Sequence, residues 1–203
     1  MKIIGLTGPS GAGKGCCNEF FRKHGIPCLD TDQIYHNLLI PPSPCTNELV
    51  ENFGETILNP DGTVNRSQLA FIVFGEKSGT AVKKLNQITH KYVLKETLSL
   101  IEQCRAQKAP TVVIDAPLLF EASFDRFCDF CIAILAKKEI RLHRITERDH
   151  ITEEKAMARI EAQPEDAFYF NRAKYTVYNN NGLQTLFHEL HLILISENVS
   201  IDT

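Results

Sequence analysis

The sequence predicts an α/β fold in which a parallel sheet is covered by helices on both faces. Short, unbroken apolar runs alternate along the chain with longer segments whose apolar residues recur at helical spacing. With 203 residues and 43% hydrophobic content, the chain can bury one core with an inserted subdomain, but hardly two independent domains. We therefore expect one domain whose ligands bind at the carboxyl ends of the strands.

The amino-terminal segment is interpreted as a strand, a loop, a helix and a second strand. Residues 3–6 form an apolar run typical of a strand buried on both faces. Residues 14–23 follow with a helical pattern, which Gly25 and Pro27 end. A short strand is then expected over residues 28–30.

Residues 33–110 predict a mainly helical insertion, in which a substrate could bind. The stretch 40–59 is rich in proline and serine and is interpreted as loop with a little helix, ending in a turn over residues 59–62. Asn65 or Ser67 can cap the helix that comes next. A longer helix should precede the third strand.

The carboxyl-terminal half returns to alternating strands and helices. In order, it predicts strands over 111–115 and 130–135, a charged helical hairpin over 139–162 interrupted at His150, a strand over 174–178 and a helix over 183–195. Charged helical hairpins of this kind suit a lid. We therefore expect residues 139–173 to form a lid region.

Composition and charge restrict the class of partner and the compartment. The formal net charge of -3 and the pI of about 6.2 provide no broad basic field, so no nucleic-acid partner is expected. Glycine soon interrupts the apolar run at the start, so neither a signal peptide nor a membrane span is expected there.

Seven cysteines, an odd number, suit reduced thiols and a cytoplasmic protein. Cys128 and Cys131 form a C-x-x-C that we interpret as two buried small side chains. The oligomeric state stays open.

A phosphate-binding motif lies between the first strand and the first helix. Residues 8–14 read G-P-S-G-A-G-K and fit the pattern G-x-x-x-x-G-K in the strand-to-helix context that this motif requires. Its glycines let backbone N–H groups approach phosphate oxygens, and the lysine adds a positive charge. The motif predicts a single P-loop kinase-type domain that binds ATP. The expected nucleotide contacts are Gly8, Gly11, Ala12, Gly13, Lys14, Gly15 and Cys16.

Gly15 departs from the motif, which usually has Ser or Thr at this position as a ligand of Mg²⁺. Because Mg²⁺ keeps several waters, a water could fill the gap and be held near Asp115 or Asp32. Mg²⁺ is therefore expected as a cofactor, although no protein ligand is certain. Alternatively, the chain could be a nucleotide-binding regulator without turnover.

Acidic and basic residues elsewhere suit phosphoryl transfer to a hydroxyl. Asp30 and Asp32 follow the second strand, and we expect Asp32 to act as the general base. Both acids could instead cap a turn and the helix after it. Arg144 and Arg148 are four residues apart on one helix face, where they could neutralise charge on the transferred phosphoryl group.

Several segments together carry a resemblance to one family. They are GLTGPSGAGK at 5–14, LDTD at 29–32, NPDGTVNRSQLAFIVF at 59–74, LNQITH at 85–90, IDAPLLFE at 114–121, RITERD at 144–149, RIEAQ at 159–163 and YNNNG at 178–182. From Ile4 to about Leu190, the sequence resembles the dephospho-CoA kinases. A nucleoside or nucleotide kinase of the same fold is the second interpretation, with a different acceptor pocket.

The resemblance implies transfer of the ATP γ-phosphate to the ribose 3′-hydroxyl of dephospho-CoA, the last step of coenzyme A synthesis. It implies that Asp32 is the base, that Lys14 clamps the phosphates and that Arg144 and Arg148 act from the lid. The residues that it places near adenine or the acceptor are Asn180, Arg66, His90, Pro117, Leu118 and Glu121. Besides Gly15, one departure is Lys91, where the family usually has proline.

Overall fold

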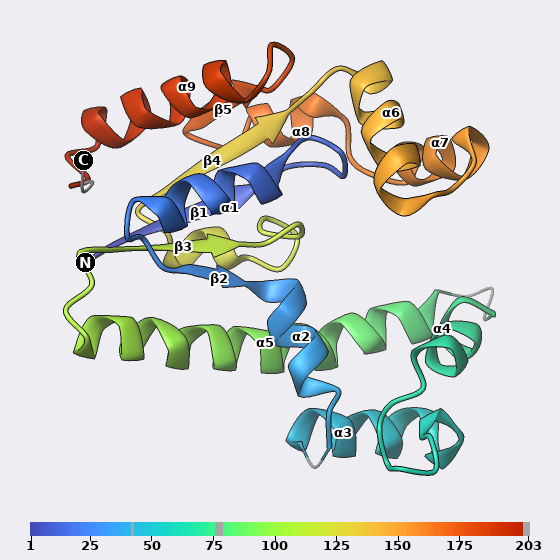
Figure 1. Ribbon diagram of the computed structural model, residues 1–203. Coiled ribbons are helices and arrows are strands. Elements are labelled where there is room, and N and C mark those ends of the chain that lie inside the picture. The colour runs from blue at the N-terminus through green and yellow to red at the C-terminus, as the bar shows by residue number, and fades with distance from the viewer. Residues whose placement is uncertain (42, 76–78, 201–203) are drawn as a thin grey trace. The chain divides into compact units, whose positions relative to one another are not determined.

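The computed structural model describes residues 1–41, 43–75 and 79–200 of the chain (Figure 1). The described chain forms two compact units. The first joins Met1–Asp30 to the chain from Ile101 onward, and the second consists of Thr31–Leu100. The stretches predicted as loop over 40–59 and as helix before the third strand include residue 42 and residues 76–78, which lie outside the described residues.

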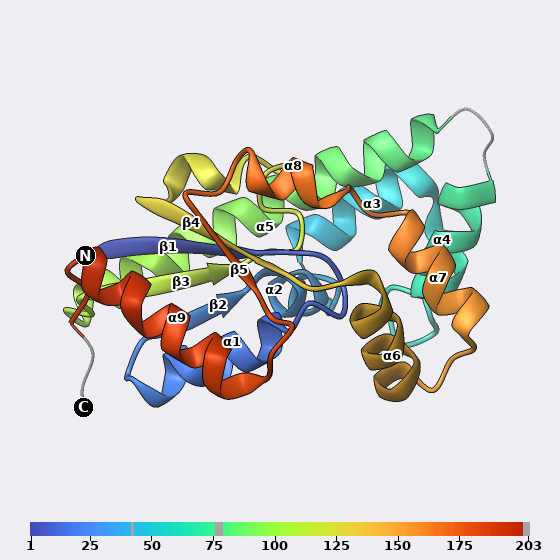
Figure 2. The ribbon, with the colours of Figure 1, turned by 90° about the horizontal axis from the view of Figure 1, so that it is seen from above.

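A parallel sheet forms the centre of the first unit. Within the described residues it has five strands in the order β2-β3-β1-β4-β5 (Figure 1; seen from above in Figure 2). The strands are β1 (Lys2–Thr7), β2 (Cys28–Asp30), β3 (Thr111–Asp115), β4 (Phe130–Leu135) and β5 (Tyr175–Tyr178). Every pair is parallel, and β3 and β4 are buried along their whole length. Strands with both faces covered explain the unbroken apolar runs, and the predicted α/β fold is confirmed.

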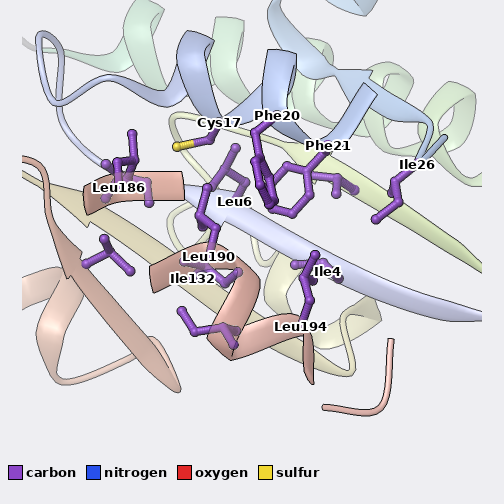
Figure 3. Close-up of a cluster of buried hydrophobic side chains, with 14 of the residues drawn as sticks. Ile4, Leu6, Cys17, Phe20, Phe21, Ile26, Ile132, Leu186, Leu190 and Leu194 are labelled. Carbon is purple, nitrogen blue, oxygen red and sulfur yellow. The ribbon is translucent and has the colours of Figure 1, made fainter. Parts of the chain in front are cut away.

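Helices cover both faces of this sheet. The helices of the first unit are α1 (Lys14–Lys23), α6 (Lys138–Asp149), α7 (Glu153–Glu161), α8 (Asp166–Phe170) and α9 (Leu183–Ser196). Side chains of α1 and α9 meet those of β1 and β4 in one buried cluster, to which Ile132 contributes (Figure 3). The next residue of β4, Ala133, instead packs with Tyr169 of α8. Because neighbouring residues of a strand point to opposite faces, α8 lies on the other face from α1 and α9.

The hairpin of α6 and α7 begins and ends as its sequence predicts. His150 ends α6 in the left-handed conformation, with φ of 52°. Thr152 caps α7, because its hydroxyl accepts a hydrogen bond from the backbone N–H of Lys155. Ile145 of α6 packs on Ile160 of α7 in a small apolar cluster of the hairpin. The hairpin therefore has its own packed contact between its two helices.

The second unit is mainly helical. Its helices are α2 (Thr31–Leu38), α3 (Pro44–Phe53), α4 (Arg66–Gly75) and α5 (Thr80–Ala106), the last of which continues past the boundary at Leu100. A 3-10 turn over Glu55–Ile57 follows α3. Apolar residues of these helices form a core of their own, which includes Leu49, Val73 and Ile88.

The interpretation of residues 40–59 as mostly loop is wrong, because α3 occupies ten residues of this stretch. The serine and proline that suggested a loop start the helix instead. Ser43 accepts a hydrogen bond from Thr46 N–H at 3.0 Å, and Pro44 occupies the first turn, where its missing N–H costs nothing. Leu49 is fully buried in the core of the second unit, and this burial stabilises the helix although Ser43 and Pro44 by themselves suggested a loop.

The turn predicted over 59–62 and the cap of the next helix are confirmed. Asn59 accepts a backbone hydrogen bond from Gly62 at 2.9 Å and donates one to Thr63 at 2.8 Å. Of the two candidate caps, Asn65 is the one that caps α4, because its side-chain oxygen accepts from Gln68 N–H at 3.0 Å.

All seven cysteines are free thiols. Cys131 is buried on β4, and Cys128 is half-buried just before that strand. Both sulfurs lie close to Gly5, since a Cβ atom at Gly5 would be 3.0 Å from each. The interpretation as small buried side chains is therefore confirmed for Cys131 and holds in part for Cys128.

In the described parts of the chain, no helix has the length and apolarity that a membrane crossing requires.

Candidate active site

The phosphate loop, residues Gly8 to Lys14, connects β1 to α1. Gly8, Gly11 and Gly13 have φ values of 140°, 79° and 109°, a region that glycine adopts at little cost. The loop folds back on itself, so that Nζ of Lys14 donates a hydrogen bond to the carbonyl of Gly8 at 2.7 Å. Lys14 thus links the two ends of the loop and holds a positive charge beside its first peptide.

Close packing around the loop gives a second reason for its glycines. A Cβ atom at Gly8 would lie 2.1 Å from the backbone oxygen of Ile134 on β4. At Gly13 it would lie 2.3 Å from Nδ2 of Asn179, which follows β5. The loop is therefore held against the strands behind it, and this packing leaves no room for a side chain at either glycine.

Gly13→Ala is expected to lower the free energy of unfolding by about 1–3 kcal/mol, because alanine there is strained and displaces the Asn179 side chain. Gly15→Ala is the matched control. It lies in α1, where a Cβ atom would meet nothing within 4 Å, so its stability should stay unchanged or rise slightly. Urea denaturation of both variants measures the difference. Equal stability of the two variants would contradict this account of the loop.

Arg144 of α6 binds the outer side of the phosphate loop. Its Nη1 donates to the carbonyls of Gly11 and Ala12 at 3.2 and 3.3 Å, and its Nη2 donates to the carbonyl of Asn179 at 3.1 Å. The Asn179 side chain also donates to the Ala12 carbonyl at 2.9 Å. The sequence-predicted arginine thus lies directly at the loop, bonded to its carbonyl groups.

Arg148 has a different set of contacts from Arg144. It makes a two-pronged ion pair with the neighbouring Asp149, with N···O distances of 2.7 and 2.9 Å. Arg159 of α7 binds the same carboxylate. Hydrogen bonds from Arg148 and then Arg159 hold the pKa of Asp149 at about 2. The predicted pair of arginines is therefore divided between the loop and an ion-pair cluster within the hairpin.

Residues expected near the nucleotide after the loop lie in two places. Cys16 is in the first turn of α1, where its N–H donates to the carbonyl of Gly13 at 3.1 Å. The side-chain oxygen of Asn180 accepts from the N–H of Lys137 at 2.9 Å. This bond joins the segment after β5 to the start of α6, and so fixes the Asn180 side chain between the two.

Carboxylates gather at the carboxyl ends of two neighbouring strands. Asp30 on β2 pairs in register with Asp115 on β3. Asp115 is buried, and Nδ2 of Asn18 on α1 donates to its Oδ2 at 2.5 Å. Sequence reasoning missed Asn18, although a signal was present, because it lies four residues after Lys14 and so shares that face of α1. Asp32 is exposed in the first turn of α2, in the second unit.

The residues expected around the acceptor come from both units. Pro117, Leu118 and Glu121 follow β3 in the first unit, where Leu118 exposes about half of its surface (49%). Arg66 begins α4, and His90 lies on α5 in the second unit. Burial lowers the pKa of His90. The imidazole therefore tends to be neutral, able to donate and accept hydrogen bonds rather than to carry charge.

Two further residues at the loop were not predicted from the sequence. Arg141 of α6 donates from Nε to the carbonyl of Ser10 at 2.9 Å. It also donates from Nη2 to Oε1 of Gln163 at 2.9 Å, and that same oxygen accepts from Ser10 N–H at 3.0 Å. The helical spacing of Arg141 and Arg144, three residues apart, was the available signal that both face the loop.

Comparisons with known proteins show the family and the fold of the chain. The family model for dephospho-CoA kinase matches residues 2–185. A dephospho-CoA kinase of Lactobacillus johnsonii is 37% identical over 192 residues, which cover 95% of this chain and 96% of the relative. A solved structure from Thermus thermophilus is similar with a TM-score of 0.79 at 28% identity, covering 96% of this chain and 97% of the other. The fold is also that of a dephospho-CoA kinase from Campylobacter jejuni, with a TM-score of 0.71 at 23% identity and coverage of 98% and 100%. Since the family model matches most of the chain and a full-length relative shares more than a third of its residues, this chain belongs to the dephospho-CoA kinase family.

Proposed function

We propose that the chain transfers the γ-phosphate of ATP to the ribose 3′-hydroxyl of dephospho-CoA, with Asp32 as the general base. The observation that supports this most directly is the phosphate loop, in which Lys14 and Arg144 hold positive charge against a glycine backbone. Such a loop suits a nucleoside triphosphate. Membership of the family supports a hydroxyl acceptor.

On the donor side, Lys14 would contact the β- and γ-phosphates, and the N-terminus of α1 would add its dipole. Arg144 would stabilise the negative charge that spreads over the transferred phosphoryl oxygens. Its hydrogen bonds to the carbonyls of Gly11 and Ala12 support a place for this guanidinium at the phosphate loop. We expect Arg148 to contribute from the hairpin and Asn180 to lie beside the adenine.

On the acceptor side, Asp32 would take the proton of the 3′-hydroxyl as that oxygen attacks the γ-phosphorus. The exposure of Asp32 at the start of α2 supports this role, since a base must be reachable by the substrate. We expect the remaining acceptor contacts to come from the residues that the resemblance implies, namely Arg66, His90, Pro117, Leu118 and Glu121.

Mg²⁺ fits the groups present in the first unit. The buried side-chain oxygen of Asn18 has no hydrogen-bond partner among the described residues, and the amide nitrogen of the same side chain donates to the Asp115 carboxylate. Amide and carboxylate oxygens are ligand types that Mg²⁺ accepts, directly or through water. At Gly15, the space that a side chain would fill is open. Asp115 and Asn18 would hold the ion, which when bound would offset charge on the β- and γ-phosphates.

Gly15→Ser is expected to lower the Mg²⁺ concentration that gives half-maximal rate. Serine restores the hydroxyl ligand that the motif usually provides, and the space around Gly15 can accept it. Gly15→Ala tests the effect of the side chain without the hydroxyl and should leave the Mg²⁺ titration unchanged. An identical shift in both variants, or no shift in either, would mean that the hydroxyl does not reach the ion.

The function is tested by incubating the purified chain with ATP, Mg²⁺ and dephospho-CoA and measuring coenzyme A by chromatography. Parallel reactions with nucleosides, deoxynucleosides and nucleotides test the second interpretation. Turnover of dephospho-CoA alone supports the proposal. Turnover of nucleosides without coenzyme A formation would contradict it, and tight ATP binding without any turnover would favour a regulator.

We expect the protein to act in the cytoplasm on a small-molecule substrate. Seven free cysteines suit a reducing compartment, where disulfides rarely persist.

A further inference from the structure

Both ends of the α6–α7 hairpin meet the phosphate loop at one residue, Ser10. Arg141 lies in the first turns of α6, and Gln163 lies two residues after the end of α7. The backbone carbonyl of Ser10 accepts from Arg141, and its N–H donates to Gln163. The two side chains also bind each other at 2.9 Å. Three hydrogen bonds thus close a ring that joins the loop to the base of the hairpin.

Burial makes this ring a strong constraint. Only 5% of Arg141 is exposed, so its guanidinium has exchanged water for the carbonyl of Ser10 and the amide of Gln163. Burial lowers the pKa of Arg141, and the nearby Asp166 opposes this shift. If this buried cation lost its partners, the free-energy cost of removing it from water would no longer be compensated. The guanidinium is therefore expected to keep Ser10 in one orientation.

The orientation of the Ser10 carbonyl determines the direction of the next N–H group of the loop. In a trans peptide, the carbonyl of one residue and the N–H of the next point in opposite directions. Arg141 holds the carbonyl of Ser10 toward α6, and Arg144 does the same for the carbonyls of Gly11 and Ala12. The N–H groups of Gly11 and Gly13 are consequently directed away from α6, where they can face an anion.

We propose that Arg141 and Gln163 are positioning residues that preset the phosphate loop for ATP by fixing both backbone groups of Ser10. They do not touch the reacting atoms in this account. Their effect passes through the peptide planes of the loop, and it links the loop to the hairpin that we expect to act as a lid. The inference rests on the proposed function, since it takes ATP as the ligand of the loop.

The test measures ADP binding by calorimetry and steady-state kinetics for Arg141→Gln and Gln163→Ala. Each variant is expected to weaken ADP binding and raise KM for ATP by about 10-fold, the scale of one lost charge-assisted hydrogen bond. The KM for dephospho-CoA should change little. Gln163→Glu keeps an acceptor for both donors and should bind ADP nearly as the parent protein does. A cavity of about 400 Å³ borders Arg141 and Gln163, so the shortened side chains leave space that water can fill, and the variants should fold.

Glu161→Gln is the matched control. Glu161 also connects the two helices, through an ion pair of 3.4 Å with Lys138, and among the described residues neither member of this pair forms a hydrogen bond with the phosphate loop. Its loss should leave ADP affinity unchanged. In the double variant of Arg141 and Gln163, the loss should be well below the product of the single losses, because both act through Ser10.

ADP affinity within twofold of the parent protein in both single variants, with unchanged melting temperatures, would overturn the proposal. So would an equal loss in the Glu161→Gln control, since general loosening of the hairpin would then explain the data. Because ADP binding needs no acceptor, this result is independent of the coenzyme A assay. A chain that binds ADP as predicted but forms no coenzyme A would reject the proposed function alone.

Discussion

Asp32→Asn is expected to lower kcat by about 10²-fold or more, the usual scale for a general base. Asparagine keeps the shape of the side chain but cannot accept the proton of the attacking hydroxyl. Asp32 is exposed in the first turn of α2, so the change should have little effect on folding. The KM for ATP should stay close to that of the parent protein, because the phosphate loop is built from other residues. Steady-state kinetics with each substrate varied in turn measures both quantities.

The control for this experiment is Glu51→Gln, which removes one negative charge from an exposed position on α3 of the same unit. It should leave kcat unchanged, since a single exposed charge has little effect at a distance in salt. A kcat for Asp32→Asn within twofold of the control would reject the role of base. It would favour the simpler interpretation that this acid caps the start of a helix.

The sequence was sufficient for most of the fold because local chemistry and tertiary packing agree there. The middle of β3 and the whole of β4 are apolar because both faces of these strands are covered. The break at His150 was readable because Thr152 and the acids after it are strong helix-start residues. At α3 the local signal was ambiguous, since Ser43 and Pro44 suit a loop as well as a helix start. Burial of Leu49, which the sequence does not reveal, decided between them.

The phosphate loop was the most predictable part of the candidate site, because there the backbone itself provides the binding groups. The glycines of the phosphate loop must be glycines because their φ values are positive and neighbouring atoms leave no space. Side chains that act through distant contacts were harder to find. Arg141 meets Ser10 across 131 positions of sequence, and Asn18 meets Asp115 across 97. Helical spacing puts each of them on the same helix face as a predicted site residue, but only the fold reveals the partner that each one contacts.

Lys14 and Arg144 both bind backbone carbonyls of the phosphate loop, one from the loop itself and one from α6. The motif alone predicted Lys14, whereas the contact of Arg144 with the carbonyls of Gly11 and Ala12 required the fold. Together they place two cationic groups on one short loop. In a site from which water is partly excluded, charges fixed in advance stabilise a transition state without the cost of reorganising solvent.

Lys14→Met is therefore expected to lower kcat by about 10²–10³-fold, the loss seen when one fixed donor to a developing charge is removed. Methionine keeps much of the length of the side chain but removes the ammonium group that binds the Gly8 carbonyl at 2.7 Å. The KM for ATP should rise as well, because the same charge attracts the phosphates in the ground state. Kinetics at saturating dephospho-CoA separates the two effects.

Lys23→Met is the matched control, because Lys23 is an exposed lysine in the last turn of the same helix α1. Its loss removes only a small favourable interaction with the helix dipole and should leave kcat unchanged. If Lys14→Met retained more than a tenth of the control's kcat, the electrostatic account of the loop would be wrong. Catalysis would then have to depend on the arginines of α6, and Arg144→Met would show the larger loss instead.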